Sequence, residues 1–66
     1  MKLTINGEAR EVDKVNTVGE LLPALGLDAR QVVVELNQAV IKRNDVDQTP
    51  IHENDCLEIL RFVGGG

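Results

Sequence analysis

Few residues of this 66-residue chain could carry out chemistry, because histidine and cysteine occur only once each. His52 and Cys56 stand across a turn and the start of a strand, which is poor geometry for a nucleophile and its base. One cysteine and one histidine cannot fill the four positions of a structural zinc site. The carboxylates are scattered and form no pair that we can place in a cleft. We therefore expect no active site, with His52 a solvated turn residue and Cys56 a small packing residue.

The other chemically notable feature is the C-terminal run of Gly64, Gly65 and Gly66. Glycine has no side chain to pack and loses the most backbone freedom on ordering, so the run makes no sense as a structural element. It is not a phosphate-binding loop, because no helix follows it. The reactive group that remains is the carboxylate of Gly66, which is ionised at neutral pH. Attack of this carboxylate on the α-phosphate of ATP would give an acyl-adenylate, from which a sulfur nucleophile could displace AMP.

A tail without side chains also suits a narrow channel, because glycine lets the backbone approach a binding site closely. Three extended residues span at most about 10 Å. We therefore interpret residues 63–66 as a flexible tail that brings Gly66 into the nucleotide pocket of another protein. The alternative is an inert end that simply frays.

The elements that must position this tail follow from hydrophobic spacing and turn signals. Alternating polar and apolar residues and β-branched runs predict the strands, and Asn6-Gly7 predicts a tight hairpin turn between the first two. The expected strands are Lys2–Ile5, Glu8–Val12, Gln31–Leu36, Ala39–Ile41 and Cys56–Phe62. Residues 42–48 are polar and are expected to be irregular, and residues 52–55 form a turn.

A short helix is predicted over Thr17–Leu25, where apolar residues recur on one stripe. Thr17 and Glu20 have the spacing of a capping box, and Gly26 stands where a residue often ends a helix. Pro23 should kink or loosen the helix, since it lacks an amide hydrogen and crowds the preceding turn.

The order of elements predicts an α+β fold in which one main helix packs on one face of a mixed four- to five-stranded sheet. A single domain over residues 1–66 is expected. Placing the last strand parallel to the first would give a ubiquitin-like β-grasp arrangement, although the spacing does not reveal that pairing. In the last strand, Leu57 and Ile59 should face the core. Leu60 and Phe62 should then form an exposed apolar patch beside the tail, with Arg61 adding charge, and we interpret these three residues as a partner-binding surface.

Composition excludes several other classes of protein. The net charge is −4 and the single aromatic residue is Phe62, a combination that is unlike a nucleic-acid binder. No apolar run exceeds three residues, so no membrane span or secretion signal is expected. A lone cysteine forms no internal disulfide, and we expect a cytoplasmic protein.

The sequence as a whole resembles the thiamine-biosynthesis sulfur carrier proteins, which are small β-grasp relatives of ubiquitin. The segments that carry the resemblance are Leu3–Glu8, Thr17–Leu22, Leu25–Leu27, Val34–Asn37 and Leu57–Gly66. The chain departs from the family at Pro23 and at Asn54, which stands where glycine is common and which also tolerates a positive φ.

The resemblance implies a carrier that partner enzymes act on, rather than an enzyme. An E1-like adenylyltransferase would adenylate Gly66 with Mg-ATP, and a cysteine desulfurase route would supply the sulfur for a thiocarboxylate. Thiazole synthase would accept that sulfur for the thiazole ring of thiamine. The chain itself would bind no cofactor or metal permanently.

Three alternatives stay open at this point. The small subunit of molybdopterin synthase uses the same thiocarboxylate, but it usually carries proline before its terminal glycines, whereas residues 60–63 contain none. A ubiquitin-like modifier would be joined through Gly66 to lysines of other proteins. A β-grasp interaction module with an inert tail would need no chemistry at Gly66 at all.

Overall fold

Five strands form one mixed sheet in this protein, whose structure is a computed structural model that describes residues 1–62. The strands are β1 (Lys2–Ile5), β2 (Glu8–Glu11), β3 (Val32–Leu36), β4 (Ala39–Ile41) and β5 (Cys56–Arg61). Their order across the sheet is β2-β1-β5-β3-β4. β5 therefore lies at the centre, parallel to β1 and antiparallel to β3. The expected β-grasp arrangement is confirmed, including the parallel pairing that the sequence did not reveal.

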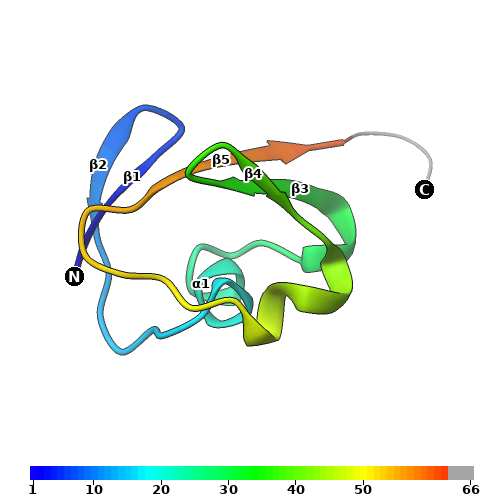
Figure 1. Cartoon of the computed structure of the whole chain (residues 1–66), viewed down its shortest axis with the longest axis horizontal. Helices are drawn as coiled ribbons and strands as arrows, with labels where there is room; N and C mark the ends of the chain where they lie inside the picture. The colour runs from blue at the N-terminus through cyan, green and yellow to red at the C-terminus, as the bar shows by residue number, and fades with distance from the viewer. Residues whose placement is uncertain (63–66) are drawn as a thin grey trace.

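One face of the sheet is covered by the helix α1 (Val18–Ala24), as Figure 1 shows. The helix begins where predicted, because the Thr17 side chain accepts a hydrogen bond from the backbone N–H of Glu20. The reciprocal bond differs from a standard capping box. The Glu20 carboxylate accepts from the N–H of Asn16, one residue before Thr17, at 2.6 Å.

The helix includes Pro23 and ends one residue after it. Its end is a Schellman motif, in which the N–H of Leu27 donates to the carbonyl of Leu22 and the N–H of Gly26 donates to that of Pro23. Gly26 has φ +77°, the left-handed conformation that this motif requires. The proline thus stands in the last turn of a short helix, where it has no N–H to donate to the carbonyl of Gly19.

Two short 3₁₀ helices were not predicted. η1 (Ala29–Gln31) leads from α1 into β3, and η2 (Arg43–Gln48) replaces the irregular segment expected after β4. η2 could not be predicted from the sequence, because a single apolar residue, Val46, among polar residues forms no periodic pattern. In η1, hydrogen bonds from Arg30 lower the pKa of the exposed Asp28 carboxyl to about 2.

The core lies between the sheet and α1, and it is aliphatic as predicted. Its side chains come from every layer, since α1, β1, β3, β5 and the connecting segments each contribute. The buried residues are Leu3, Ile5, Val15, Val18, Leu21, Leu22, Val32, Val34, Val46, Ile51, Leu57 and Ile59. Leu57 and Ile59 face this core as expected, so the alternate residues of β5 point to the opposite, uncovered face.

Candidate functional site

The base of the predicted reactive tail is the end of β5. Gly64, Gly65 and Gly66, together with the rest of the predicted tail at residues 63–66, lie outside the described residues. β5 ends at Arg61, and the N–H of Phe62 still donates to the carbonyl of Gln31 at 3.1 Å. Backbone pairing therefore holds the chain up to the last described residue, and the strand that leads toward the glycines belongs to the centre of the sheet.

Two asparagine side chains form hydrogen bonds to the backbone of β5 in addition to those of its strand pairing. β1 pairs with β5 only at Thr4 and Ile5, but the Asn6 amide accepts from the N–H of Ile59 at 2.7 Å and donates to its carbonyl at 3.1 Å. The Asn6 side chain thereby takes the place of a further residue of β1. On the other side of β5, the Asn37 side chain accepts from the N–H of Cys56 at 3.0 Å.

Both asparagines have positive φ, +51° at Asn6 and +50° at Asn37, and both stand in hairpin turns. Asparagine tolerates this conformation better than most residues, and its amide both donates and accepts. In each hairpin, one asparagine thus adopts the backbone conformation of the turn and also forms side-chain hydrogen bonds to β5.

We expect Asn6→Gly to destabilise the fold by about 1–3 kcal/mol, because two partly buried polar groups of Ile59 lose their partner while the turn keeps its backbone conformation. Urea unfolding measures the loss, and amide exchange should show faster exchange at Ile59. Asn6→Asp is a second variant: it keeps an acceptor for the N–H of Ile59 but sets a carboxylate oxygen against the Ile59 carbonyl, so it should also lose stability. Wild-type stability in Asn6→Gly would contradict this role for the side chain.

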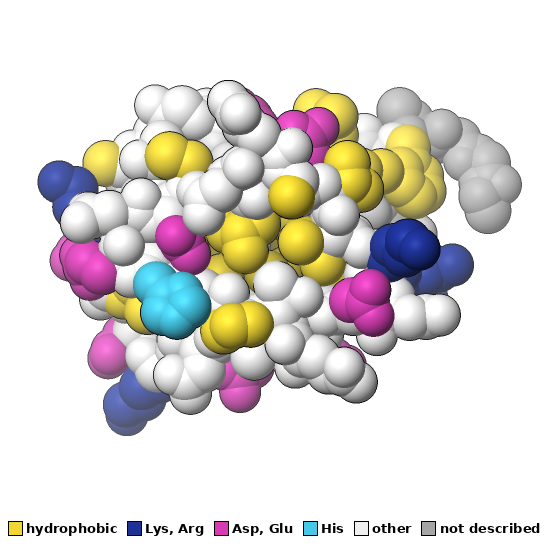
Figure 2. Space-filling view, in the orientation of Figure 1, with side chains coloured by type: hydrophobic (Ala, Val, Ile, Leu, Met, Phe, Trp, Pro, Cys, Tyr) yellow, Lys and Arg dark blue, Asp and Glu magenta, His cyan; other side chains and the backbone are white. Residues whose placement is uncertain are grey.

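The predicted partner-binding residues divide between the two faces of the sheet. Leu60 and Phe62 are 60% and 52% exposed and lie on the uncovered face. Leu60 is directly opposite Val33, which is 38% exposed, and Val40 of β4 on the same face is 63% exposed. We call these four residues the open-face patch. Figure 2 shows several hydrophobic side chains at the upper right of the molecule, with acidic atoms next to the uppermost of them.

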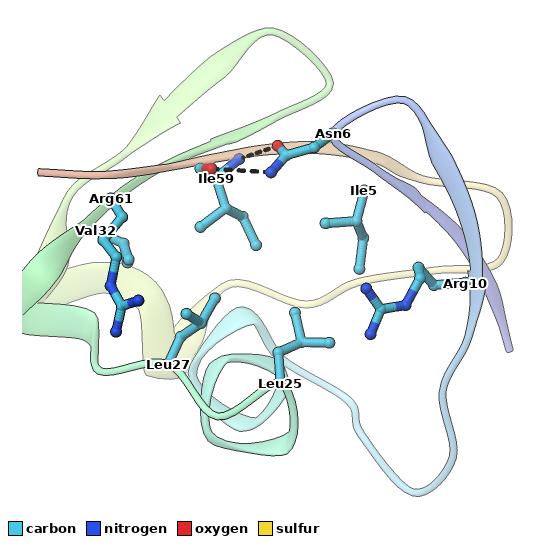
Figure 3. A pocket seen from close by; sticks show the side chains of 8 residues that line it. All are labelled: Ile5, Asn6, Arg10, Leu25, Leu27, Val32, Ile59 and Arg61. Carbon is cyan, nitrogen blue, oxygen red and sulfur yellow. Dashed lines mark hydrogen bonds between the residues drawn. The ribbon is translucent and has the colours of Figure 1, made fainter.

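Arg61 is on the other face, so the structure does not bring it together with Leu60 and Phe62. It is opposite Val32, which is a core residue, and it lines a pocket of about 250 Å³ between the sheet and the end of α1. Figure 3 shows Arg10 of β2 and Arg61 at opposite sides of this pocket. Its walls are mainly aliphatic, formed by Ile5, Leu25, Leu27, Val32 and Ile59, with Asn6 at the rim.

The remaining candidate residues lie on the surface. Cys56 is an exposed free thiol on the uncovered face, not the packing residue expected from the sequence. His52 is exposed, and its Nδ1 atom lies 3.9 Å from a carboxylate oxygen of Asp55. Among residues 1–62, no group of three or more His, Cys, Asp or Glu side chains is placed to hold a metal ion. In the same residues, no helix is long and apolar enough to cross a membrane.

Sequence reasoning missed Val40, Arg10 and the pocket. Alternation along the strand separates Val33 from Val32 and Val34, but nothing in the sequence says which strand lies beside it. The register between β3 and β5 puts Val33 next to Leu60. A patch assembled across three strands is therefore a product of the sheet order.

Comparison with known proteins adds to this geometry. The family model described as "ThiS family" matches residues 3–66. The sulfur carrier protein ThiS of Bacillus subtilis is 32% identical over 65 residues, covering 97% of this chain and 98% of that protein. A crystal structure of the thiamine biosynthesis protein ThiS from Geobacter metallireducens superposes with a TM-score of 0.83 at 43% identity, covering 100% of both chains.

A second kind of relative is much longer. The thiazole synthase of Paramagnetospirillum magneticum is 44% identical over all 66 residues, and the thiazole synthase of Magnetococcus marinus is 36% identical over the same length. The chain spans 20% of the length of each of these two proteins.

Proposed function

Because the chain belongs to the ThiS family of sulfur carriers in thiamine biosynthesis, we propose that the carboxylate of Gly66 carries the sulfur. The observation that supports this most directly is the placement of β5. The strand at the centre of the sheet leads to the glycine run, and pairing holds it through Phe62. A rigid body that presents a side-chain-free end suits a carrier, whose terminus must enter the active sites of other proteins.

The proposed activation takes place on a partner adenylyltransferase. A Gly66 carboxylate oxygen attacks the α-phosphate of ATP and pyrophosphate leaves, giving an acyl-adenylate. The terminal sulfur of a persulfide, supplied by a cysteine desulfurase route, attacks the carbonyl carbon and AMP leaves. A thiol then cleaves the resulting S–S bond, which leaves a thiocarboxylate on Gly66. ATP and Mg²⁺ are used by the adenylyltransferase, so the carrier needs no cofactor of its own. We also propose that the carrier works in the cytoplasm together with these partners.

Thiazole synthase is the proposed acceptor of the sulfur. Two relatives named thiazole synthase contain a stretch similar to this whole chain. Joining a carrier and its acceptor in one polypeptide raises their effective concentration, which is favourable for proteins that must meet. This supports an association between the separate carrier and a thiazole synthase. Leu60 and Phe62 on the uncovered face are the proposed contact residues, whereas Arg61 lies on the other face and is not part of that surface.

The proposal predicts a defined change of intact mass. After incubation with ATP, the adenylyltransferase and a persulfide source, mass spectrometry should find one oxygen of the chain replaced by sulfur, and fragmentation should place the change at Gly66. Omitting ATP is the control, because without adenylation the carboxylate has no adequate leaving group. An unchanged mass with all components active would contradict the proposal, and isopeptide-linked products would favour the protein-modifier alternative.

A further inference from the structure

The first hairpin turn contains the only asparagine of the chain that is followed by glycine, Asn6-Gly7. Such a pair has a reactivity of its own, because the backbone nitrogen of the second residue can attack the side-chain amide carbon of the first within one molecule. Glycine leaves this nitrogen without a side chain beside it. Asparagine is one of the thermolabile residues of proteins. Both reacting groups therefore stand next to each other in this turn.

The structure restrains one of the two reacting groups and leaves the other free. Apart from the chain neighbours of Gly7, no atom lies within 4 Å of the place that a Cβ would take there. Among residues 1–62, the N–H of Gly7 donates no hydrogen bond to another backbone group. In contrast, both polar atoms of the Asn6 amide are bonded to the backbone of Ile59, as Figure 3 shows. The amide carbon is restrained, whereas the attacking nitrogen is not.

The restraint on Asn6 is a contact between β1 and β5. The amide oxygen lies 2.7 Å from the backbone nitrogen of Ile59, and the amide nitrogen lies 3.1 Å from its carbonyl oxygen. The backbone N–H of Asn6 also donates to the carbonyl of Leu57 at 2.9 Å. The side chain must leave both of its partners before it can turn toward the nitrogen of Gly7. The first hairpin must therefore open away from β5 before the two groups can react.

We propose that Asn6 is a site of spontaneous deamidation, and that opening of the first hairpin away from β5 controls the rate. In the open state, the backbone nitrogen of Gly7 loses its proton to hydroxide and attacks Cγ of Asn6. The bond from Cγ to the side-chain nitrogen breaks, and ammonia leaves with a proton from water. Water then opens the cyclic imide at either of its carbonyl carbons. The product is an aspartate, or an isoaspartate that is linked to Gly7 through its side chain, and the net change converts amide and water into carboxylate and ammonium.

Either product weakens the attachment of β5. A carboxylate at position 6 sets an oxygen against the carbonyl of Ile59, which needs a donor. The isoaspartate also adds one atom to the main chain of the turn, so the hairpin loses its pairing of Ile5 with Glu8. β1 pairs with β5 only at Thr4 and Ile5. The strand that leads to the glycine run is therefore held less firmly after the reaction.

The test follows the full chain by intact mass and by the masses of its fragments, at one mildly alkaline pH, both folded and in concentrated urea. In urea, deamidation should occur first at Asn6. Gly7→Ala should slow it there at least about tenfold, because a side chain then crowds the attacking nitrogen. The folding of this variant does not matter, since the comparison is made between unfolded chains.

Asn37 is a control within the same chain. It has nearly the same φ as Asn6 and its side chain also bonds to β5, but glutamine follows it. Asn37 should therefore stay intact over the time in which Asn6 reacts.

Amide exchange at Ile59 measures the opening directly, because the N–H of Ile59 donates to the Asn6 side chain. Folding should slow deamidation at least about tenfold, and by the same factor, to within about threefold, as it slows exchange at Ile59. A chain in which Asn6 has fully reacted should have a lower urea midpoint than the fresh protein, as Asn6→Asp should.

Four results would overturn the inference. Equal rates in the folded chain and in urea would mean that the bonds to Ile59 do not restrain Asn6. A folded chain that reacts far more slowly than exchange at Ile59 allows would mean that opening at this place is not sufficient. Deamidation of Asn37 as fast as that of Asn6 in urea would remove the special role of Gly7. An unchanged urea midpoint after complete reaction would show that the Asn6 amide does not hold β5.

Discussion

Removing Gly65 and Gly66 should abolish sulfur transfer completely while leaving the fold intact. All buried core residues lie within residues 3–59, and the last described backbone hydrogen bond is the one from Phe62. The deletion removes none of these core residues, so we expect the free energy of unfolding to stay within about 0.5 kcal/mol of the wild type. Thiocarboxylate formation, followed by intact mass, should fall to zero, because the deletion removes the Gly66 carboxylate that we propose to be adenylated.

A tag provides the matched control for this prediction. The same short peptide should abolish thiocarboxylate formation when it follows Gly66, since it converts the carboxylate into a peptide bond, and should be tolerated before Met1. A deletion variant that still acquires sulfur would refute the role of the glycines. A deletion variant that also unfolds would mean that the tail takes part in the fold, contrary to our division between body and tail.

Gly19→Ala should destabilise the protein by about 1–3 kcal/mol, although alanine is the better helix former. Gly19 lies in the first turn of α1, which packs closely against η2. A Cβ atom at this position would collide with the Asp47 carboxylate and come within 2.9 Å of the Asp47 Cα atom. The carboxylate can turn away, but the backbone of η2 must shift. Urea unfolding would measure the effect, and thermal unfolding should show a drop of about 4–8 °C per kcal/mol.

Two further variants isolate the cause. Ala24→Gly in the same helix reports the ordinary preference for alanine, and it should cost up to about 1 kcal/mol. Asp47→Ala combined with Gly19→Ala should recover part of the loss, since it removes the carboxylate but leaves the clash with the backbone of residue 47. If Gly19→Ala instead raised the free energy of unfolding, the helix preference of alanine would outweigh the close approach of η2.

Local signals were sufficient for most individual elements. The stripe of apolar residues and the Thr17 cap located α1, and the turn at Asn6-Gly7 located the first hairpin, because these features depend on residues close together in the sequence. β2 and β5 each end one residue earlier than predicted, and β3 begins one residue later. η2 was missed, since a buried Val46 among polar residues has no recognisable period.

The sequence predicted the exposure of Leu60 and Phe62, but it did not predict Val40, Arg10 or the arrangement of the surface. Alternation along β5 placed Leu60 and Phe62 opposite the core face, which the structure confirms. The same alternation applied to Arg61 puts it on the core face, yet its closeness in sequence had grouped it with its neighbours. The structure places it beside the pocket with Arg10 instead.

The sequence by itself determined the class of the fold, the aliphatic core and the chemical character of the end of the chain, because each depends on residue type and short-range spacing. Tertiary structure alone decided that β5 pairs between β1 and β3. That pairing brings Val33 to Leu60 and Glu35 to Glu58, residues more than 20 positions apart in the chain. Strand order and register arise from packing the whole core at once, so no local pattern records which outward-facing side chains will share a surface.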